Sequence, residues 1–167
     1  MVQAELGKGS FARVYRVTRK ADGQTYALKR VRISRMSRKE LTDTLSEVRF
    51  LASIKHPALI RYYDSFYDER TSELCIVMEY ADAGDLAARL ARCEAARTRL
   101  DEAVVWSLFL QLMEGLAYLH RKRVVHRDVK SANCFLTAGG RLKLGDLNVS
   151  SLLKGGFVRT QVRRAPP

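Results

Sequence analysis

The segment at residues 126–133, HRDVKSAN, gathers several side chains that could take part in catalysis. The carboxylate of Asp128 could accept a proton from an attacking hydroxyl group. Asn133 and, further along, Asp146 offer oxygen atoms of the kind that magnesium prefers. Taken singly, Asp128 could equally cap a turn and Asn133 could simply end a loop. The order of these residues along the chain is therefore more informative than any one of them.

A glycine-bearing segment near the N-terminus, residues 7–14 (GKGSFARV), joins two apolar runs. Gly7 and Gly9 would let backbone N–H groups approach phosphate oxygens that a Cβ atom would obstruct. By itself, a pair of glycines in a hairpin is more often only a turn.

Lys29 lies at the end of an apolar run, YALK, where an unpaired ammonium group would be costly to bury. It therefore needs anionic partners. Glu47, on a predicted helix, could supply one and a phosphate group the other. The alternative is a lysine at a strand edge whose side chain reaches solvent.

In combination, these residues resemble the motifs of protein kinases, in the order in which that family carries them. The resemblance covers residues 6–162, and Lys130, two residues after Asp128, is typical of the serine/threonine class. Three runs are similar to the NIMA-related branch of the family: IVMEY at 76–80, NCFL at 133–136 and LGDLNVS at 144–150.

The resemblance implies binding of ATP and Mg²⁺ and transfer of the γ-phosphate to serine or threonine hydroxyls of a protein substrate. Asp128 would accept the proton of the acceptor hydroxyl and Lys130 would contact the γ-phosphate. A catalytically inactive kinase fragment that binds only nucleotide or protein partners is the alternative. The residues expected to act in catalysis are Asp128, Lys130, Lys29 and Glu47, and those expected to bind the metal are Asn133 and Asp146.

The same resemblance implies a nucleotide pocket, although each of its residues could equally belong to the core. Ala12 replaces the usual third glycine, and Asn148 replaces the glycine of the metal-binding triplet. Thr160 is the candidate for regulatory phosphorylation, with an ordinary exposed threonine as the alternative. The residues expected to contact the nucleotide are Leu6, Gly7, Lys8, Gly9, Val14, Ala27, Lys29, Met78, Glu79, Ala81 and Phe135. Those expected to stack between the two lobes are Leu51, Tyr62, His126 and Leu147.

The elements that must position these groups fall into a sheet-rich half and a helical half. Runs at 13–19 and 25–32 flank Asp22-Gly23, a dipeptide suited to a hairpin. Leu41, Leu45, Val48 and Leu51 recur at helical spacing after a Ser37–Glu40 capping box. Gly84-Asp85 and Asp101 precede two further helical stretches, and short strands are predicted at 134–136 and 142–144.

The predicted fold class is α+β, a two-lobe protein kinase-like fold. Residues 1–80 form the N-lobe with its glycine-rich loop, residues 81–162 form part of the C-lobe, and residues 163–167 depart from the family pattern as an aberrant tail. The run at 104–119 is apolar almost all the way round, and such a helix requires burial. We therefore expect marginal folding of the isolated chain, because the C-lobe is expected to be truncated in the activation segment.

Composition excludes few functions. The formal charge is +12, but arginines are spread singly, which favours a solvated surface over a nucleic-acid site. Neither a membrane span nor a secretory signal is visible, and three widely spaced cysteines predict reduced thiols. The expected location is cytoplasmic, with association with the cytoskeleton or nucleus left open, and the oligomeric state is undetermined.

Overall fold

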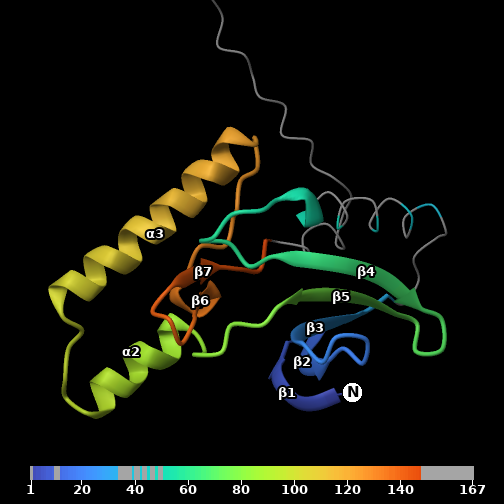
Figure 1. Cartoon of the computed structure of the whole chain (residues 1–167), viewed down its shortest axis with the longest axis horizontal. Helices are drawn as coiled ribbons and strands as arrows, with labels where there is room; N and C mark the ends of the chain where they lie inside the picture. Colours follow the sequence, from blue (N-terminus) through green and yellow to red (C-terminus); the bar gives the residue numbers. More distant parts are fainter. Residues whose placement is uncertain are drawn as a thin grey trace, which may run out of the picture.

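The chain is described by a computed structural model that covers residues 2–9, 12–33, 39, 42, 45, 48 and 51–147. Its N-terminal half is an antiparallel sheet of five strands in the order β1-β2-β3-β5-β4 (Figure 1). The strands are β1 (Val2–Lys8), β2 (Ala12–Thr18), β3 (Thr25–Arg32), β4 (Tyr62–Asp68) and β5 (Glu73–Glu79).

The predicted hairpin around Asp22-Gly23 is confirmed and joins β2 to β3. Gly23 has a φ of 69°, a conformation that favours glycine. The Asp22 carboxylate accepts the Gln24 N–H at 3.0 Å and pairs with Arg19, and this pairing holds the pKa of Asp22 near 2. β2 begins at Ala12 and ends at Thr18, one residue earlier at each end than predicted.

The helix predicted between the third and fourth strands is confirmed at the positions that are described there. Residues 39, 42, 45, 48 and 51–53 are helical, and both Val48 and Leu51 are buried in the hydrophobic core. The predicted Ser37–Glu40 capping box and Glu47 lie outside the described residues.

Two longer helices follow the sheet, α2 (Leu86–Ala95) and α3 (Glu102–Arg121). As predicted, the first of them begins directly after Gly84-Asp85, and Asp85 caps it by accepting the Ala88 N–H at 2.8 Å. Asp101 occupies the N-cap position of α3 without a side-chain hydrogen bond.

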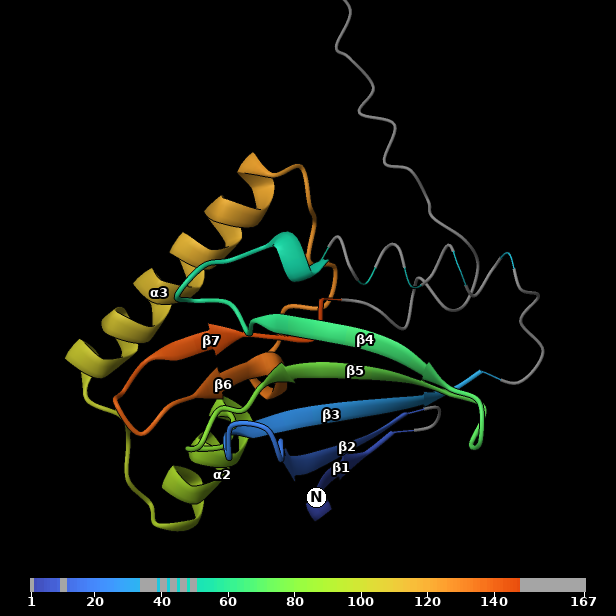
Figure 2. The same cartoon turned by 45° about the vertical axis from the view of Figure 1, so that its right-hand side comes forward.

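The predicted short hairpin is confirmed residue for residue as β6 (Cys134–Leu136) and β7 (Leu142–Leu144), preceded by the 3₁₀ turn η1 (Ser131–Asn133). It lies beside the end of the large sheet (Figure 2). Leu144 fixes it there, because its N–H donates to Ala58 O at 2.8 Å and its carbonyl accepts from the Ile60 N–H at 2.9 Å. The loop between α3 and β6, which leads into this hairpin, is thereby held near the sheet.

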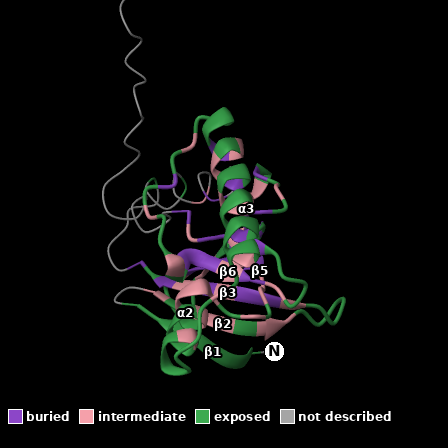
Figure 3. Ribbon diagram, turned by 90° about the vertical axis from the view of Figure 1, so that its left-hand side faces the viewer, coloured by how far each residue is buried: buried purple, intermediate pink, exposed green. Residues whose placement is uncertain are grey.

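One side of α3 packs on the core, and the other side is exposed. Leu108 and Leu119 are buried, whereas several large apolar residues of α3 are exposed, and much of this helix has the colour of exposed residues in Figure 3. The sequence predicts that this helix is buried on all sides, but among the described residues α3 is buried on one side only. Length and composition alone would let α3 cross a membrane, but a core helix of a folded domain meets the same test. The exposed side chains are Val105, Trp106, Phe109, Leu110 and Met113.

The predicted divisions of the chain at 80/81 and 162/163 stay predictions, and residues 148–167, with Asn148, Thr160 and the predicted tail, lie outside the described residues. Cys75, Cys93 and Cys134 are all free thiols, as predicted.

Candidate functional site

A cleft of about 310 Å³ opens between the large sheet and the β6–β7 hairpin. Nine of the eleven residues predicted to contact nucleotide line it, together with both predicted metal ligands; Lys8 and Gly9 do not. The predicted residues that line it are Leu6, Gly7, Val14, Ala27, Lys29, Met78, Glu79, Ala81, Phe135, Asn133 and Asp146.

Four further residues that line the cleft were not predicted from the sequence: Ile60, Tyr80, Gly84 and Asp85. Tyr80 could have been found from its position between the predicted contacts Glu79 and Ala81. Gly84 and Asp85 follow shortly after Ala81, but their residue types indicated the start of a helix rather than a binding site. Ile60 carries no sequence signal, because its place depends on the pairing of its N–H with β7.

Strand register places the lysine of the cleft. In β3, Lys29 lies opposite Val14 of β2 and Ile76 of β5, and Ala27 lies opposite Met78. Ala27 and Lys29 are two residues apart in a strand and therefore share one face. The small side chain of Ala27 leaves room in the cleft, while the lysine reaches toward the β6–β7 hairpin.

Lys29 forms an ion pair that joins the sheet to the segment after β7. Its ammonium lies 2.5 Å from Asp146 Oδ1, and the lysine is only 7% exposed. This carboxylate supplies the anionic partner that a buried ammonium needs. The other predicted partner, Glu47, lies outside the described residues.

Asp128 is held by two neighbours in the loop between α3 and β6. Lys130 Nζ donates to Asp128 Oδ2 at 2.8 Å, and Asn133 Nδ2 donates to the same oxygen at 3.0 Å and to the Asp128 carbonyl at 2.8 Å. The hydrogen bonds from Lys130 and Asn133 lower the pKa of Asp128, and the same contact raises the pKa of Lys130. Asp128 is therefore a carboxylate at neutral pH, available as a proton acceptor.

His126 connects this loop to the segment that carries Asp146. The ring is buried, with Nδ1 accepting the Asp128 N–H at 3.3 Å and Nε2 2.9 Å from the Gly145 carbonyl. Because Nδ1 accepts, Nε2 carries the proton and donates to Gly145. Burial lowers the pKa of His126, consistent with a neutral ring.

The backbone is strained at both ends of this connection. Arg127 and Asp146 have φ values of 68° and 56°, in the left-handed region that residues other than glycine seldom adopt. A second hydrogen bond, from Gly145 N to Asn133 O at 2.9 Å, ties the two segments together. Such strain persists only where the surrounding contacts hold it, and it concentrates at functional sites.

The residues predicted to hold magnesium fit that ion. Because Asn133 Nδ2 donates to Asp128, its Oδ1 is the atom left for a cation, and Asp146 contributes a carboxylate that is 39% exposed. Among the described residues, no group of three or more His, Cys, Asp or Glu could hold a metal ion. Magnesium at this place would complete its shell with phosphate oxygens and water, as it commonly does in nucleotide sites.

Gly145 has no room for a side chain. A Cβ atom there would lie 2.7 Å from Phe135 Cε2 and 2.9 Å from Ile60 Cγ1. We expect Gly145→Ala to displace the Phe135 ring into the cleft and to lower the free energy of unfolding by about 1–3 kcal/mol. Urea denaturation measures this. Gly139→Ala is the matched control, because the nearest atom lies 3.9 Å from its Cβ position; equal losses in both variants would contradict the prediction.

Lys143 of β7 connects the hairpin to the end of β5. Its ammonium lies 2.9 Å from Glu79 Oε1 and donates to Pro57 O at 3.0 Å. The other carboxylate oxygen, Glu79 Oε2, accepts the Arg61 N–H at 3.2 Å. Glu79 is therefore fixed where it lines the cleft.

Lys143→Met is expected to weaken the binding of ADP severalfold, because Glu79 loses the partner that fixes this wall of the cleft. The lost charge-assisted hydrogen bonds should also cost about 1–3 kcal/mol of stability. Isothermal titration calorimetry and urea denaturation measure the two effects. Lys55→Met, at an exposed position, is the control, and an unchanged ADP affinity in Lys143→Met would refute the expected role.

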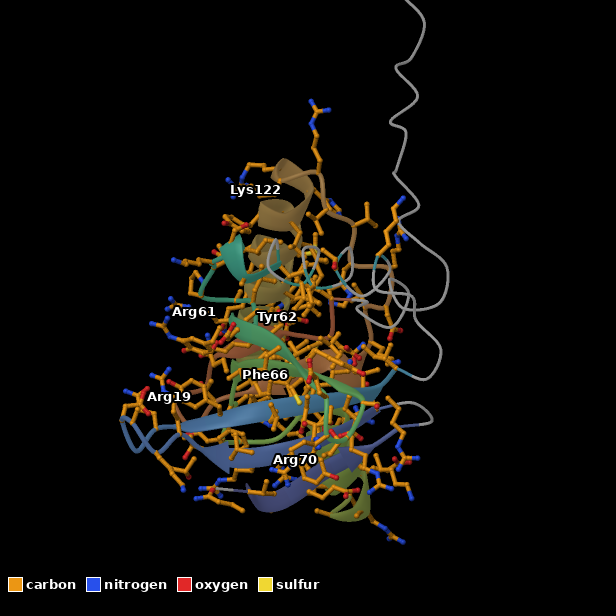
Figure 4. All side chains as sticks on the ribbon, turned by 90° about the vertical axis from the view of Figure 1, so that its right-hand side faces the viewer. Arg19, Arg61, Tyr62, Phe66, Arg70 and Lys122 are labelled. Atoms are coloured by element: carbon orange, nitrogen blue, oxygen red, sulfur yellow. The ribbon has the colours of Figure 1, made fainter. Side chains whose placement is uncertain are left out.

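The residues predicted to stack between the lobes are all buried. Leu51, Tyr62 and Leu147 belong to one core cluster, and His126 is 1% exposed. Tyr62 enters this core from the start of β4 (Figure 4). Burial raises the pKa of its hydroxyl group, which stays protonated at physiological pH.

The protein kinase domain model matches residues 1–165. Similar proteins include a probable serine/threonine-protein kinase nek2 of Dictyostelium discoideum, 37% identical over 89% of the chain and 36% of that protein. Nek1 of Mus musculus is 38% identical over 89% of the chain and 12% of that protein, and Nek2 of Homo sapiens is 37% identical over 89% and 34%. The chain thus spans about a third or less of the length of these relatives. On these grounds the chain belongs to the protein kinase family, and the relatives named above are Nek serine/threonine-protein kinases.

Proposed function

We propose that the protein is a serine/threonine protein kinase that transfers the γ-phosphate of ATP to hydroxyl groups of a protein substrate. The observation that carries the proposal is the convergence of Lys29, Asn133 and Asp146 on one cleft, with Asp128 hydrogen-bonded to Asn133. The family membership supports the same reaction, and the relatives are named as kinases of this class.

The apolar part of the cleft suits the adenine ring. Leu6, Val14, Ala27 and Phe135 line it, and Glu79 and Ala81, which also line the cleft, would offer backbone hydrogen bonds. A planar apolar base with a few backbone hydrogen bonds is the ligand that such a wall accepts. Lys29, which also lines the cleft, is the cation that would meet the phosphates.

Magnesium, bound by Asn133 and Asp146 with the phosphates, would neutralise negative charge on the transferring group. Asp128 orients the acceptor hydroxyl and accepts its proton, which its lowered pKa permits at neutral pH. Lys130, beside Asp128, supplies positive charge where the γ-phosphate is transferred. Lys29, with Glu47, positions ATP.

The direct test is a phosphotransfer assay on the full chain with ATP, MgCl₂ and a generic protein substrate such as casein. Incorporation of phosphate into serine or threonine is the expected result.

We further propose a cytoplasmic location, with cytoskeletal or nuclear association open, and a surface that binds neither nucleic acid nor membrane. Fluorescence imaging tests the location, and a salt-dependent DNA-binding assay tests the statement on nucleic acid.

A further inference from the structure

A second cavity, of about 510 Å³, lies between α2 and the β6–β7 hairpin. These elements lie side by side in both views of the chain (Figures 1 and 2). We call this cavity the α2 groove. Its lining includes Arg89, Arg92, Cys93, Thr98, Leu136 and Thr137.

The α2 groove is separate from the nucleotide cleft. Phe135 lines the cleft and Leu136 lines the groove, as expected for neighbours in a strand, whose side chains point to opposite faces. Backbone hydrogen bonds close the junction between them: Leu136 N donates to Gly84 O at 2.8 Å, and Ala83 N donates to Leu136 O at 3.0 Å. A ligand in the groove would therefore not occupy the nucleotide site.

The charged side chains of the groove wall are arginines. Arg89 and Arg92 are three residues apart on α2 and so share a face. Among the described residues that line the groove, none is acidic. Within the described part of the chain, Arg89 has no side-chain hydrogen bond or ion pair, and Arg92 uses only Nε, which donates to Ala88 O at 3.3 Å. Both terminal guanidinium edges are thus left for an external acceptor.

The two carboxylates that precede α2 in the chain form hydrogen bonds with backbone N–H groups instead of ion pairs with these arginines. Asp85 accepts the Ala88 N–H at 2.8 Å as the cap of α2, and Asp82 accepts the Ala138 N–H at 2.7 Å. Each holds a loop that shapes the groove.

The rest of the groove is apolar or already hydrogen-bonded. Leu136 forms a buried floor, and Cys93 is half-buried beside it. Thr98 Oγ1 donates to Cys93 O at 3.4 Å, and Thr137 Oγ1 accepts the Arg141 N–H at 3.1 Å. A suitable occupant therefore combines carboxylates for the arginines with an apolar side chain for the floor.

We propose that the α2 groove docks an extended acidic segment of a partner protein. Its Asp or Glu side chains pair with Arg89 and Arg92, whose guanidinium groups match carboxylates in a bidentate manner. One apolar side chain of the segment rests on Leu136. The proposal does not depend on the catalytic function, because docking requires neither ATP nor the residues of the cleft.

A short fluorescent peptide rich in Asp and Glu, with a single leucine, tests this by anisotropy titration with the full chain. We expect Arg89→Glu/Arg92→Glu to weaken binding about tenfold or more, because both attractive pairs become repulsive. The matched control is Arg70→Glu/Lys122→Glu, which changes the net charge equally at two exposed positions. Arg70 lies in the turn between β4 and β5 and Lys122 directly follows α3, and both of these places lie away from α2 (Figure 1). It should change affinity less than about twofold, as expected for distant screened charges.

A milder pair, Arg89→Gln/Arg92→Gln, should give an intermediate loss and keeps the test valid if the reversed pair fails to fold. Equal weakening in the groove and control variants would overturn the proposal, because general attraction by the basic chain would then explain binding. Displacement of the peptide by excess ADP would also overturn it, since the peptide would then occupy the cleft. The proposal would also be overturned if an oligothymidylate displaced the peptide and its own binding depended on the same two arginines. The groove would then be a nucleic-acid site.

Discussion

Asp128→Ala should lower phosphotransfer by about 10²–10⁴-fold, the usual contribution of a positioned proton acceptor. The carboxylate is ionised at neutral pH because Lys130 and Asn133 hydrogen-bond to it, so its loss removes an acceptor that is ready to act. ADP affinity should change little, since Asp128 does not line the nucleotide cleft. The predicted signature is a loss of kcat with nucleotide binding retained.

The assay compares phosphate incorporation by the parent chain, Asp128→Ala and Asp101→Ala. Asp101 is a suitable control because it is exposed and its side chain makes no capping hydrogen bond. Equal, background-level transfer by all three proteins would contradict the enzyme function for this chain. Nucleotide binding would then identify the chain as a non-catalytic binding module.

The sequence predicted the local elements of this site well because their signals are local. Asp22-Gly23 requires a tight turn, and the β6 and β7 runs are short, apolar and separated by glycines, so each boundary depends on nearby residues. The cleft was predicted for a different reason. Its residues follow the order of a known family, and that order carries more information than the propensity of any one of them.

What the sequence could not predict depends on contacts between distant segments. Ile60 reaches the cleft because it pairs with Leu144, and Lys143 reaches Glu79 across a large gap in sequence. The partner of Lys29 shows the same limit. A buried ammonium requires an anion, but only the packing of the hairpin against the sheet brings Asp146 within 2.5 Å of it.

The Lys29–Asp146 pair also shows how the fold positions the carboxylate that is proposed to bind magnesium. Asp146 sits at a positive φ directly after Gly145, whose backbone is hydrogen-bonded to both His126 and Asn133. The loop with Asp128 and the segment with Asp146 are therefore fixed relative to each other. A change at Asp146 should disturb metal binding more than it disturbs the fold.

Asp146→Asn is expected to abolish the strengthening of ADP binding by magnesium and to lower phosphotransfer by about 10³-fold, because metal stabilisation of a transferring phosphoryl group is worth several kcal/mol. The amide retains the shape and one acceptor oxygen for Lys29 but loses the negative charge that magnesium prefers. Calorimetric titration of ADP with and without MgCl₂ measures the effect on binding. Glu69→Gln, an exposed carboxylate outside the cleft, should keep the full response to magnesium. A normal response in Asp146→Asn would show that the metal is held elsewhere, and a matching loss in Glu69→Gln would show that net charge, rather than this carboxylate, governs magnesium binding.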